Sequence, residues 1–246
     1  MRRLCIVLLL LQMLGVKAVA DQLVCHAEYL PPGSIDECMN IKPQDLQKAT
    51  AYPLRPAAIK EHATLNEGGN VKIFWNENAL LLVVDMEDSD IVQENNLDNQ
   101  PHYLSGDVLE IFIRPAGQRN YWELFATPNN RTTAYFYPSA GRKLPSCLLS
   151  DGMPGYHIKT ALNGTLNQSS DRDKNWRVIA SISIKELGKC CPLDFTQPWL
   201  IQVARYNYSI YLDETELSHI GIADNKEPNF HRFSSYVKLY FDKNRN

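Results

Sequence analysis

Several kinds of feature are scarce in this sequence, and each absence excludes a class of protein. The chain has no basic run and no helical stripe of Lys and Arg, and 28 acidic residues outnumber its 25 basic ones. Nucleic-acid phosphates need a basic surface, so we exclude a nucleic-acid partner. No Cys-x-x-Cys spacing marks a zinc site, and no EF-hand loop is present. We also find no internal repeat, coiled-coil heptad, low-complexity tract or linker, so residues 21–246 are expected to form a single domain.

The first 20 residues differ from the rest of the chain. Arg2 and Arg3 precede an apolar run over 4–14, and Ala18-Val19-Ala20 matches a cleavage site, which is the pattern of a secretory signal peptide. The apolar run is too short to span a bilayer, so we expect no membrane span. Without the signal the chain keeps 22 basic and 28 acidic residues, a net charge of −6. We therefore predict a protein that is secreted, periplasmic or at the cell surface.

Secretion would allow disulfides among the cysteines that remain after signal cleavage. These are Cys25, Cys38, Cys147, Cys190 and Cys191. Their number is odd, so at least one is free or pairs between chains. The neighbours Cys190 and Cys191 would strain to bridge each other, so we expect one or both to pair with one of the other three.

Residues 71–115 carry the clearest strand pattern. Apolar residues alternate from Val71 to Trp75, residues 76–78 read as a turn, and 80–84 are apolar on both faces, as in a central strand covered on each side. A polar loop over 88–100 is followed by a strand over 106–114. Glu110 lies in the middle of that strand, on the same face as Phe112. This carboxylate is either on a solvated outer face or directed at a ligand or metal.

Further strands are predicted from alternation and turn residues, at 21–32, 121–127, 131–137, 156–162, 176–184, 199–208 and 236–241. The stretches 138–155 and 211–226 read as loops. A short helix at 44–50 and one helical turn at 184–187 are the only helical signals. About ten short strands with polar turns predict an all-β fold, an antiparallel β-sandwich.

A series of motifs follows one order from Gly33 to Phe241. They are 33–40 at the start, Trp75-Asn76-Glu77, Leu81-Leu82-Val83, Glu87-Asp88, Gly106–Ile113, and Asn229-Phe230-His231 near the end. In this order they resemble carbohydrate-binding module family 9, modules found beside xylanase catalytic domains. The resemblance implies a β-sandwich of the DOMON-like kind and no catalysis of its own. It also implies binding to the ends of plant-type or other polysaccharide, xylan included, in polysaccharide catabolism with a glycoside hydrolase as partner.

The resemblance also implies where a sugar would bind. Family members clamp the sugar between two tryptophans, and the matching positions here are Leu104, with Tyr103 beside it, and Phe230. Glu110 matches a family carboxylate that hydrogen-bonds the sugar, whereas Ile179 replaces another family glutamate. The candidate carbohydrate-binding residues are Tyr103, Leu104, Glu110, Phe230, His231, Arg205 and Trp122.

Calcium is the one cofactor that the resemblance implies, because family members carry structural calcium in acidic loops. Asp85 and Glu87 lie beside Asp88 and Asp90, which we take as the candidate metal ligands. A solvated acidic turn is equally consistent with this run of acids.

Three other functions compete with sugar binding. A glycosidase would need a second carboxylate beside Glu110, and the sequence shows none that we can identify, so we do not predict an enzyme. Related sandwiches bind haem b, and Met39, Met86 and Met153 with the histidines leave this alternative open, although haem is not expected. An interaction or envelope domain that has lost sugar binding is favoured by Leu104 and Phe230, which replace the two tryptophans.

Overall fold

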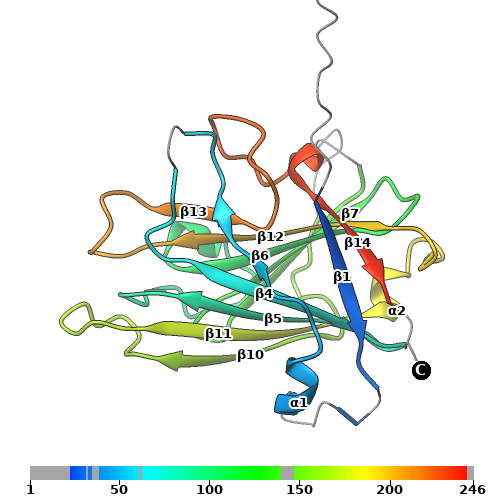
Figure 1. Cartoon of the computed structure of the whole chain (residues 1–246), viewed down its shortest axis with the longest axis horizontal. Coiled ribbons are helices and arrows are strands. Elements are labelled where there is room, and N and C mark those ends of the chain that lie inside the picture. Colours follow the sequence, from blue (N-terminus) through cyan, green and yellow to red (C-terminus); the bar gives the residue numbers. More distant parts are fainter. Residues whose placement is uncertain (1–22, 32, 35–38, 61–62, 140–146, 243–246) are drawn as a thin grey trace, which may run out of the picture.

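The computed structural model of the chain describes residues 23–31, 33–34, 39–60, 63–139 and 147–242, and its strands form two packed layers (Figure 1). Sheet A has the order β1-β14-β12-β6-β7-β8-β9, with β13 and then β3 attached to β12. Sheet B has the order β10-β11-β5-β4, and β1 and β2 both pair with β4. The predicted all-β sandwich is confirmed. The strands are β1 (Val24–Tyr29), β2 (Tyr52–Pro53), β3 (Arg55–Pro56), β4 (Gly69–Trp75), β5 (Ala79–Glu87), β6 (Val108–Arg114), β7 (Tyr121–Ala126), β8 (Thr132–Tyr137), β9 (Cys147–Leu148), β10 (Tyr156–Asn163), β11 (Asn175–Ser183), β12 (Trp199–Asn207), β13 (Glu216–His219) and β14 (Val237–Phe241).

Strand β1 joins the two sheets and is the exception to antiparallel pairing among the described strands. Its residues Val24–Ala27 pair in parallel with β14 of sheet A, and Glu28 and Tyr29 pair in parallel with β4 of sheet B. A single strand therefore closes one side of the sandwich, where it runs beside β14 (Figure 1).

The main core lies between the sheets. Strand β6 contributes Leu109, Ile111 and Ile113, which pack in the same cluster as the alternate residues of β5 from sheet B. On β5 the other set, Leu81 and Val83, packs in a second cluster on the outer side of sheet B. Strand β5 is thus apolar on both faces because both faces are covered, as its sequence predicted.

A third cluster covers the outer face of sheet A. Phe112, Tyr121 and Ala204 belong to it, with Phe230 and Tyr236 from the segment that precedes β14. The residues of β6 that do not enter the main core therefore also have apolar cover, and this outer face positions the candidate site.

The helical elements are short. Within the described ranges they are α1 (Pro43–Leu46), α2 (Ile184–Leu187), and the 3-10 turns η1 (His102–Leu104) and η3 (Phe233–Ser235). The α2 turn has the predicted bounds, and the Ser183 hydroxyl accepts the Glu186 amide at its start. Helix α1 is a single turn that ends before the predicted Thr50.

Two predicted loops contain strands. The stretch 138–155 holds β9, which pairs with β8, and 211–226 holds β13, which pairs with β12. Both strands are short and carry no long alternation, so pairing with a formed neighbour decides their conformation. This is the physical reason that sequence patterns missed them.

The described cysteines form no disulfide with one another. Cys25 is 2% exposed in the main core, whereas Cys147, Cys190 and Cys191 are exposed. The expected pairings among these four are therefore wrong for this structure, and Cys38 lies outside the described residues. The predicted signal peptide also lies outside them, and no helix in the described part of the chain is long and apolar enough to cross a membrane.

Candidate functional site

A hollow of about 420 Å³ opens on the outer face of sheet A. Its walls come from η1, β6, β7 and β12, and from the loop that leads to η3. The residues that line it are Tyr103, Glu110, Glu123, Tyr206, Glu227, Pro228, Asn229, Phe230, His231 and Arg232. Alternation along each strand places these side chains on the face turned away from the main core.

Two buried glutamates form the floor of the hollow. Glu110 is 3% exposed and Glu123 is 4% exposed. In the antiparallel register Glu110 lies opposite Phe125, and Glu123 lies opposite Phe112, so the two acids are diagonal neighbours on adjacent strands. Diagonal positions are about 7–8 Å apart. The floor of the hollow therefore carries two carboxylates on adjacent strands.

Tyrosine hydroxyls and a histidine hold the floor and the loop together. The Tyr137 hydroxyl donates to Glu123 Oε2, and Tyr121 Oη lies 3.0 Å from His231 Nδ1. His231 Nε2 is 3.7 Å from Glu123 Oε1. In the loop itself the Asn229 side chain accepts the His231 amide at 3.0 Å. These bonds fix the side of the hollow that faces Phe230.

The aromatic wall is continuous. The rings of Tyr103 and Tyr206 have centroids 5.6 Å apart, and those of Tyr206 and Phe230 are 5.7 Å apart. The Tyr208 hydroxyl donates to the Tyr103 carbonyl oxygen at 2.6 Å and holds η1 in place. Because Tyr206 contacts both rings, the arrangement is a wall of three rings. This wall differs from the two tryptophans on opposite sides of the sugar that the resemblance implied.

The electrostatics of the hollow are negative. Burial, and after it the charge of Glu110, raises the pKa of the Tyr206 hydroxyl. Burial and then the charge of Glu123 raise the pKa of Tyr135 nearby. Both hydroxyls stay protonated at neutral pH and can donate hydrogen bonds, while the glutamates supply acceptors.

Four predicted residues meet in this hollow: Tyr103, Glu110, Phe230 and His231. Leu104 does not line it, because its side chain is 70% exposed at the end of η1. The structure places Trp122 in the main core, with its ring 4.8 Å from that of Phe136, since it alternates with Glu123 along β7.

Arg205 is also placed away from the hollow. It alternates with Tyr206 on β12 and points inward, where its guanidinium lies 2.8 Å from Asp88 and both side chains have no exposed surface. A sugar in the hollow cannot reach it.

Sequence reasoning missed Glu123 and Tyr206. The expectation that the sequence holds no second carboxylate beside Glu110 is wrong, because Glu123 lies in the middle of β7 and alternates with the core residues Trp122 and Leu124. Applying strand period to 121–127 places Glu123 on the outer face, and the same period separates Tyr206 from Arg205.

The candidate calcium ligands do not fit an ion. The Asp88 carboxylate is bound by Arg205 and accepts the Asp90 amide at 3.0 Å. Asp90 Oδ2 accepts the Ile210 amide at 2.9 Å, and its Oδ1 has no hydrogen-bond partner within the described residues. No group of three or more His, Cys, Asp or Glu in the described ranges could hold a metal. Arg205 supplies the positive charge beside Asp88, where a calcium ion would otherwise supply it.

The methionines considered for haem lie in hydrophobic clusters. Met86 and Met153 are buried in the core between the sheets, and Met39 packs against the cluster on the outer side of sheet B. Met39 thus contributes to packing.

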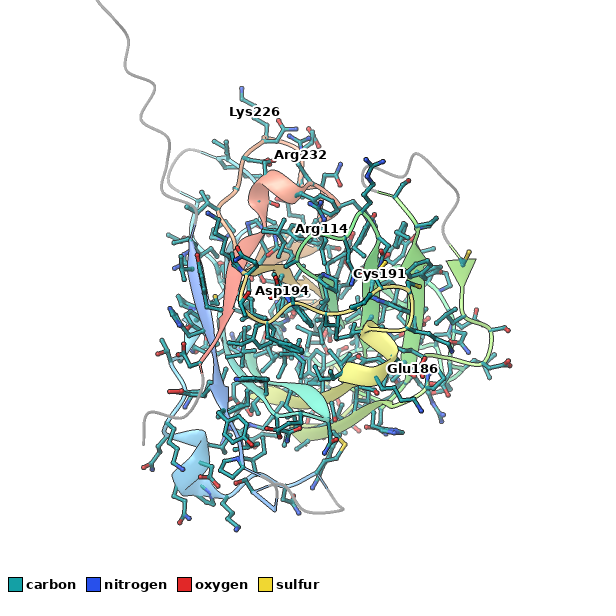
Figure 2. All side chains as sticks on the ribbon, turned by 90° about the vertical axis from the view of Figure 1, so that its right-hand side faces the viewer. Arg114, Glu186, Cys191, Asp194, Lys226 and Arg232 are labelled. Atoms are coloured by element: carbon teal, nitrogen blue, oxygen red, sulfur yellow. The ribbon has the colours of Figure 1, made fainter. Side chains whose placement is uncertain are left out.

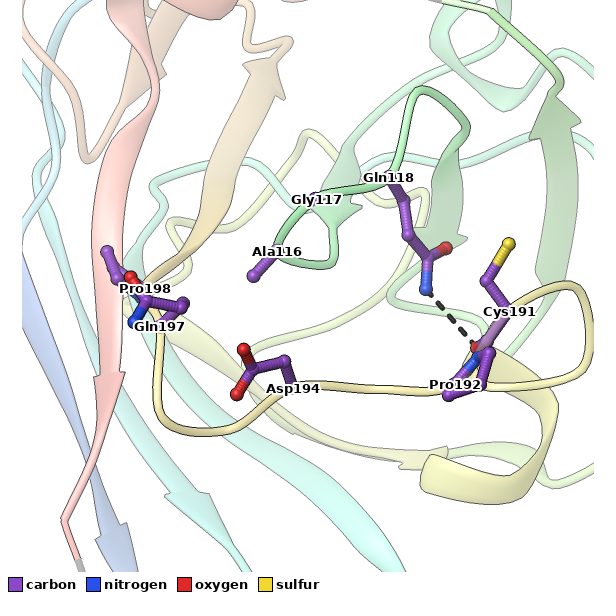
Figure 3. A pocket seen from close by; sticks show the side chains of 8 residues that line it. All are labelled: Ala116, Gly117, Gln118, Cys191, Pro192, Asp194, Gln197 and Pro198. Atoms are coloured by element: carbon purple, nitrogen blue, oxygen red, sulfur yellow. Dashed lines mark hydrogen bonds between the residues drawn. The ribbon is translucent and has the colours of Figure 1, made fainter.

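A separate hollow of about 560 Å³ lies by the loop after α2 (Figure 3). Gln118 Nε2 donates to the Cys191 carbonyl oxygen at 3.4 Å across it, and Asp194 is its one charged residue. No aromatic residue is among the described residues that line it. Cys191 and Asp194 mark its position in Figure 2.

Comparison with known proteins supports the fold. A proposed carbohydrate-binding protein from Bacteroides uniformis is similar with a TM-score of 0.67 and 13% identity, over 90% of this chain and 100% of that one. A family 9 carbohydrate-binding module from Caldicellulosiruptor kristjanssonii in complex with cellotriose has a TM-score of 0.55 and 14% identity, over 91% and 95%. One in complex with glucose has a TM-score of 0.53 and 14% identity, over 91% and 98%.

No protein-family model matches the sequence, and no curated protein matches it. At these identities the structural likeness establishes the architecture, so the chain has the sandwich fold of family 9-like carbohydrate-binding modules.

Proposed function

We propose that the protein is a secreted, non-catalytic carbohydrate-binding domain whose ligand occupies the hollow on sheet A. The observation that carries the proposal is the meeting of an aromatic wall and two buried glutamates in one hollow. The C–H face of a pyranose ring packs on aromatic rings, and carboxylates accept hydrogen bonds from its hydroxyls. The hollow also falls within the usual range for ligand sites, about 300–1,000 Å³.

The ligand class follows from the same chemistry. Glu110, Glu123 and Glu227 outnumber the single arginine of the lining, Arg232, which favours a neutral sugar over an acidic one. We infer binding to the end of a polysaccharide or oligosaccharide of plant type, such as xylan, with a glycoside hydrolase as working partner. The family 9 modules with cellotriose and with glucose support a sugar of this kind.

A glycan array followed by calorimetry tests this proposal. Wild-type protein is expected to bind at least one neutral glycan, and Glu110→Gln is expected to weaken binding by roughly 10- to 100-fold, because a charged acceptor is lost. Glu77→Gln, at the exposed turn between β4 and β5, is the matched control and should bind normally. Binding to no glycan would refute the proposal and favour an interaction domain. We expect a chelator to leave glycan binding unchanged, because Asp88, a candidate calcium ligand, is paired with Arg205.

A second candidate function is glycoside hydrolysis, which Glu123 favours. Two carboxylates in one hollow are the minimum set for this reaction, one as acid and one as base or nucleophile. Incubation of the bound oligosaccharide with wild type and Glu123→Gln would reveal it. Shortened products with wild type alone would establish the enzyme, and no products would leave the binding role.

A further inference from the structure

A second hollow, of about 470 Å³, adjoins the first. Glu227 and Pro228 line both of them, so a short loop segment is the border between the two. The rest of its lining comes from the end of β3 and the segment that follows it, from the loop before β13 and the first residues of β13, and from the loop after β13. Those residues are Pro56, Ala57, Ala58, Lys60, Ala63, Thr64, Leu65, Asn66, Asp213, Glu214, Thr215, Glu216, Leu217 and Lys226.

The strand register gives a second link between the hollows. Tyr206, in the wall of the first, lies directly opposite Leu217, in the second, on the paired strands β12 and β13. Residues in direct register share a face and have Cβ atoms about 4.5–5.5 Å apart. Both side chains pack against the same cluster on the outer face of sheet A. The two hollows therefore lie side by side on one continuous surface.

The second hollow is preformed by hydrogen bonds that main-chain amides donate. The Ala57 amide donates to the Leu217 carbonyl oxygen at 3.0 Å. The Glu216 carboxylate accepts the amides of Asn66 and Glu67, at 2.7 and 3.0 Å. These contacts tie both sides together, so a ligand would not have to order this part of the surface before it binds.

The chemistry of the second hollow differs from that of the first. Ala57, Leu65 and Leu217 provide apolar surface, and none of the described lining residues is aromatic. Its rim carries the ion pair between Lys60 and Glu214, at 2.6 Å. Lys226 lies on the rim near Arg232, and Figure 2 shows both at the same end of the molecule. Such a surface suits sugar units held by hydrogen bonds and C–H contact more than by ring stacking.

We propose that the two hollows form one extended site for an oligosaccharide. The terminal sugar lies against the aromatic wall and the two glutamates, and the following units pass Glu227 and Pro228 into the second hollow. The inference rests on the proposed function of the first hollow. It adds that the ligand is a chain of several units and that the second hollow supplies most of the length-dependent affinity.

The test is a calorimetric titration with glucose and cello-oligosaccharides up to the hexamer, with the xylose series in parallel. Wild-type affinity is expected to rise at least tenfold from the dimer to the tetramer or longer. Thr215→Met places a longer, non-aromatic side chain in the second hollow and should reduce this rise, while binding of the monomer and dimer stays unchanged. Lys226→Ala should weaken only the longer chains, and Lys189→Ala, a surface lysine beside α2, is the control.

The outcomes separate this inference from the function on which it rests. An affinity that levels off at the dimer, or a rise that is unchanged in Thr215→Met, would overturn the extended site and leave the first hollow as the whole site. Unchanged short-chain binding by the variant also shows that it is folded. Absence of any saccharide binding by wild type would overturn both proposals together.

Discussion

Replacement of Arg205 by methionine should destabilise the fold strongly without altering sugar binding. The guanidinium donates to Asp88 Oδ2 at 2.8 Å, to the Glu87 carbonyl oxygen at 2.7 Å and to Asn207 Oδ1 at 2.7 Å. Neither Arg205 nor Asp88 has exposed side-chain surface. The arginine is therefore the buried cation of a network that contains more than one acid.

The magnitude follows from what the substitution leaves behind. Burial raises the pKa of Asp88, and the charge of Arg205 opposes that effect. Asp107 lies close by, and burial and then the charge of Asp88 raise its pKa well above the usual range. Removing the cation leaves the buried Asp88 carboxylate uncompensated, which costs about 3–5 kcal/mol. A domain with a total stability of about 5–15 kcal/mol would lose a large part of it.

Urea unfolding of the wild type and the variant measures this loss. In the double variant Arg205→Met with Asp88→Asn the uncompensated charge is gone, so we expect part of the stability to return, on the order of 1–3 kcal/mol. A loss below about 1 kcal/mol for Arg205→Met, or a double variant no more stable than the single one, would refute the reasoning. If the folded variant bound the sugar with a larger dissociation constant than the wild type, Arg205 would instead be shown to contact the sugar.

Three further predictions concern the backbone, the pH dependence and the core. Gly106→Ala should cost at least about 2 kcal/mol in urea unfolding, because φ is +143° and the new Cβ would lie 2.3 Å from the Val92 carbonyl oxygen; a neutral result would contradict the strained geometry. Burial lowers the pKa of His219 from 6.5 to about 4, so its contribution to stability is present above pH 6.5 and is lost as the pH falls towards 4. The His219→Gln variant should therefore lose less stability on acidification than the wild type, by on the order of 3 kcal/mol. Identical profiles of unfolding free energy against pH for the two proteins would contradict this expectation. Trp122→Phe should cost on the order of 1 kcal/mol, since its indole nitrogen has no hydrogen-bond partner in the described structure, and should leave glycan affinity unchanged.

The candidate site was only partly predictable from sequence. Glu110 could be found because an acid inside an apolar strand breaks the expected pattern, and the resemblance added Tyr103 and Phe230. Glu123 carries the same signal, but it lies in a strand rich in aromatic residues, where the apolar–polar alternation is less clear. Arg205 was among the candidate binding residues that the resemblance implied, but its side chain is paired inside the protein. A residue match identifies a position on a strand and does not state which neighbour satisfies the charge.

Local alternation of apolar and polar residues was sufficient to determine the β-sandwich, the two-sided burial of β5 and the α2 turn, because strand period depends only on neighbours in the chain. Only the tertiary structure decided the rest: the joining of the sheets by β1, the strands β9 and β13, the partner of Asp88, and the common border of the two hollows at Glu227 and Pro228. These features depend on contacts between residues far apart in sequence, and such contacts exist only once the sheets have packed.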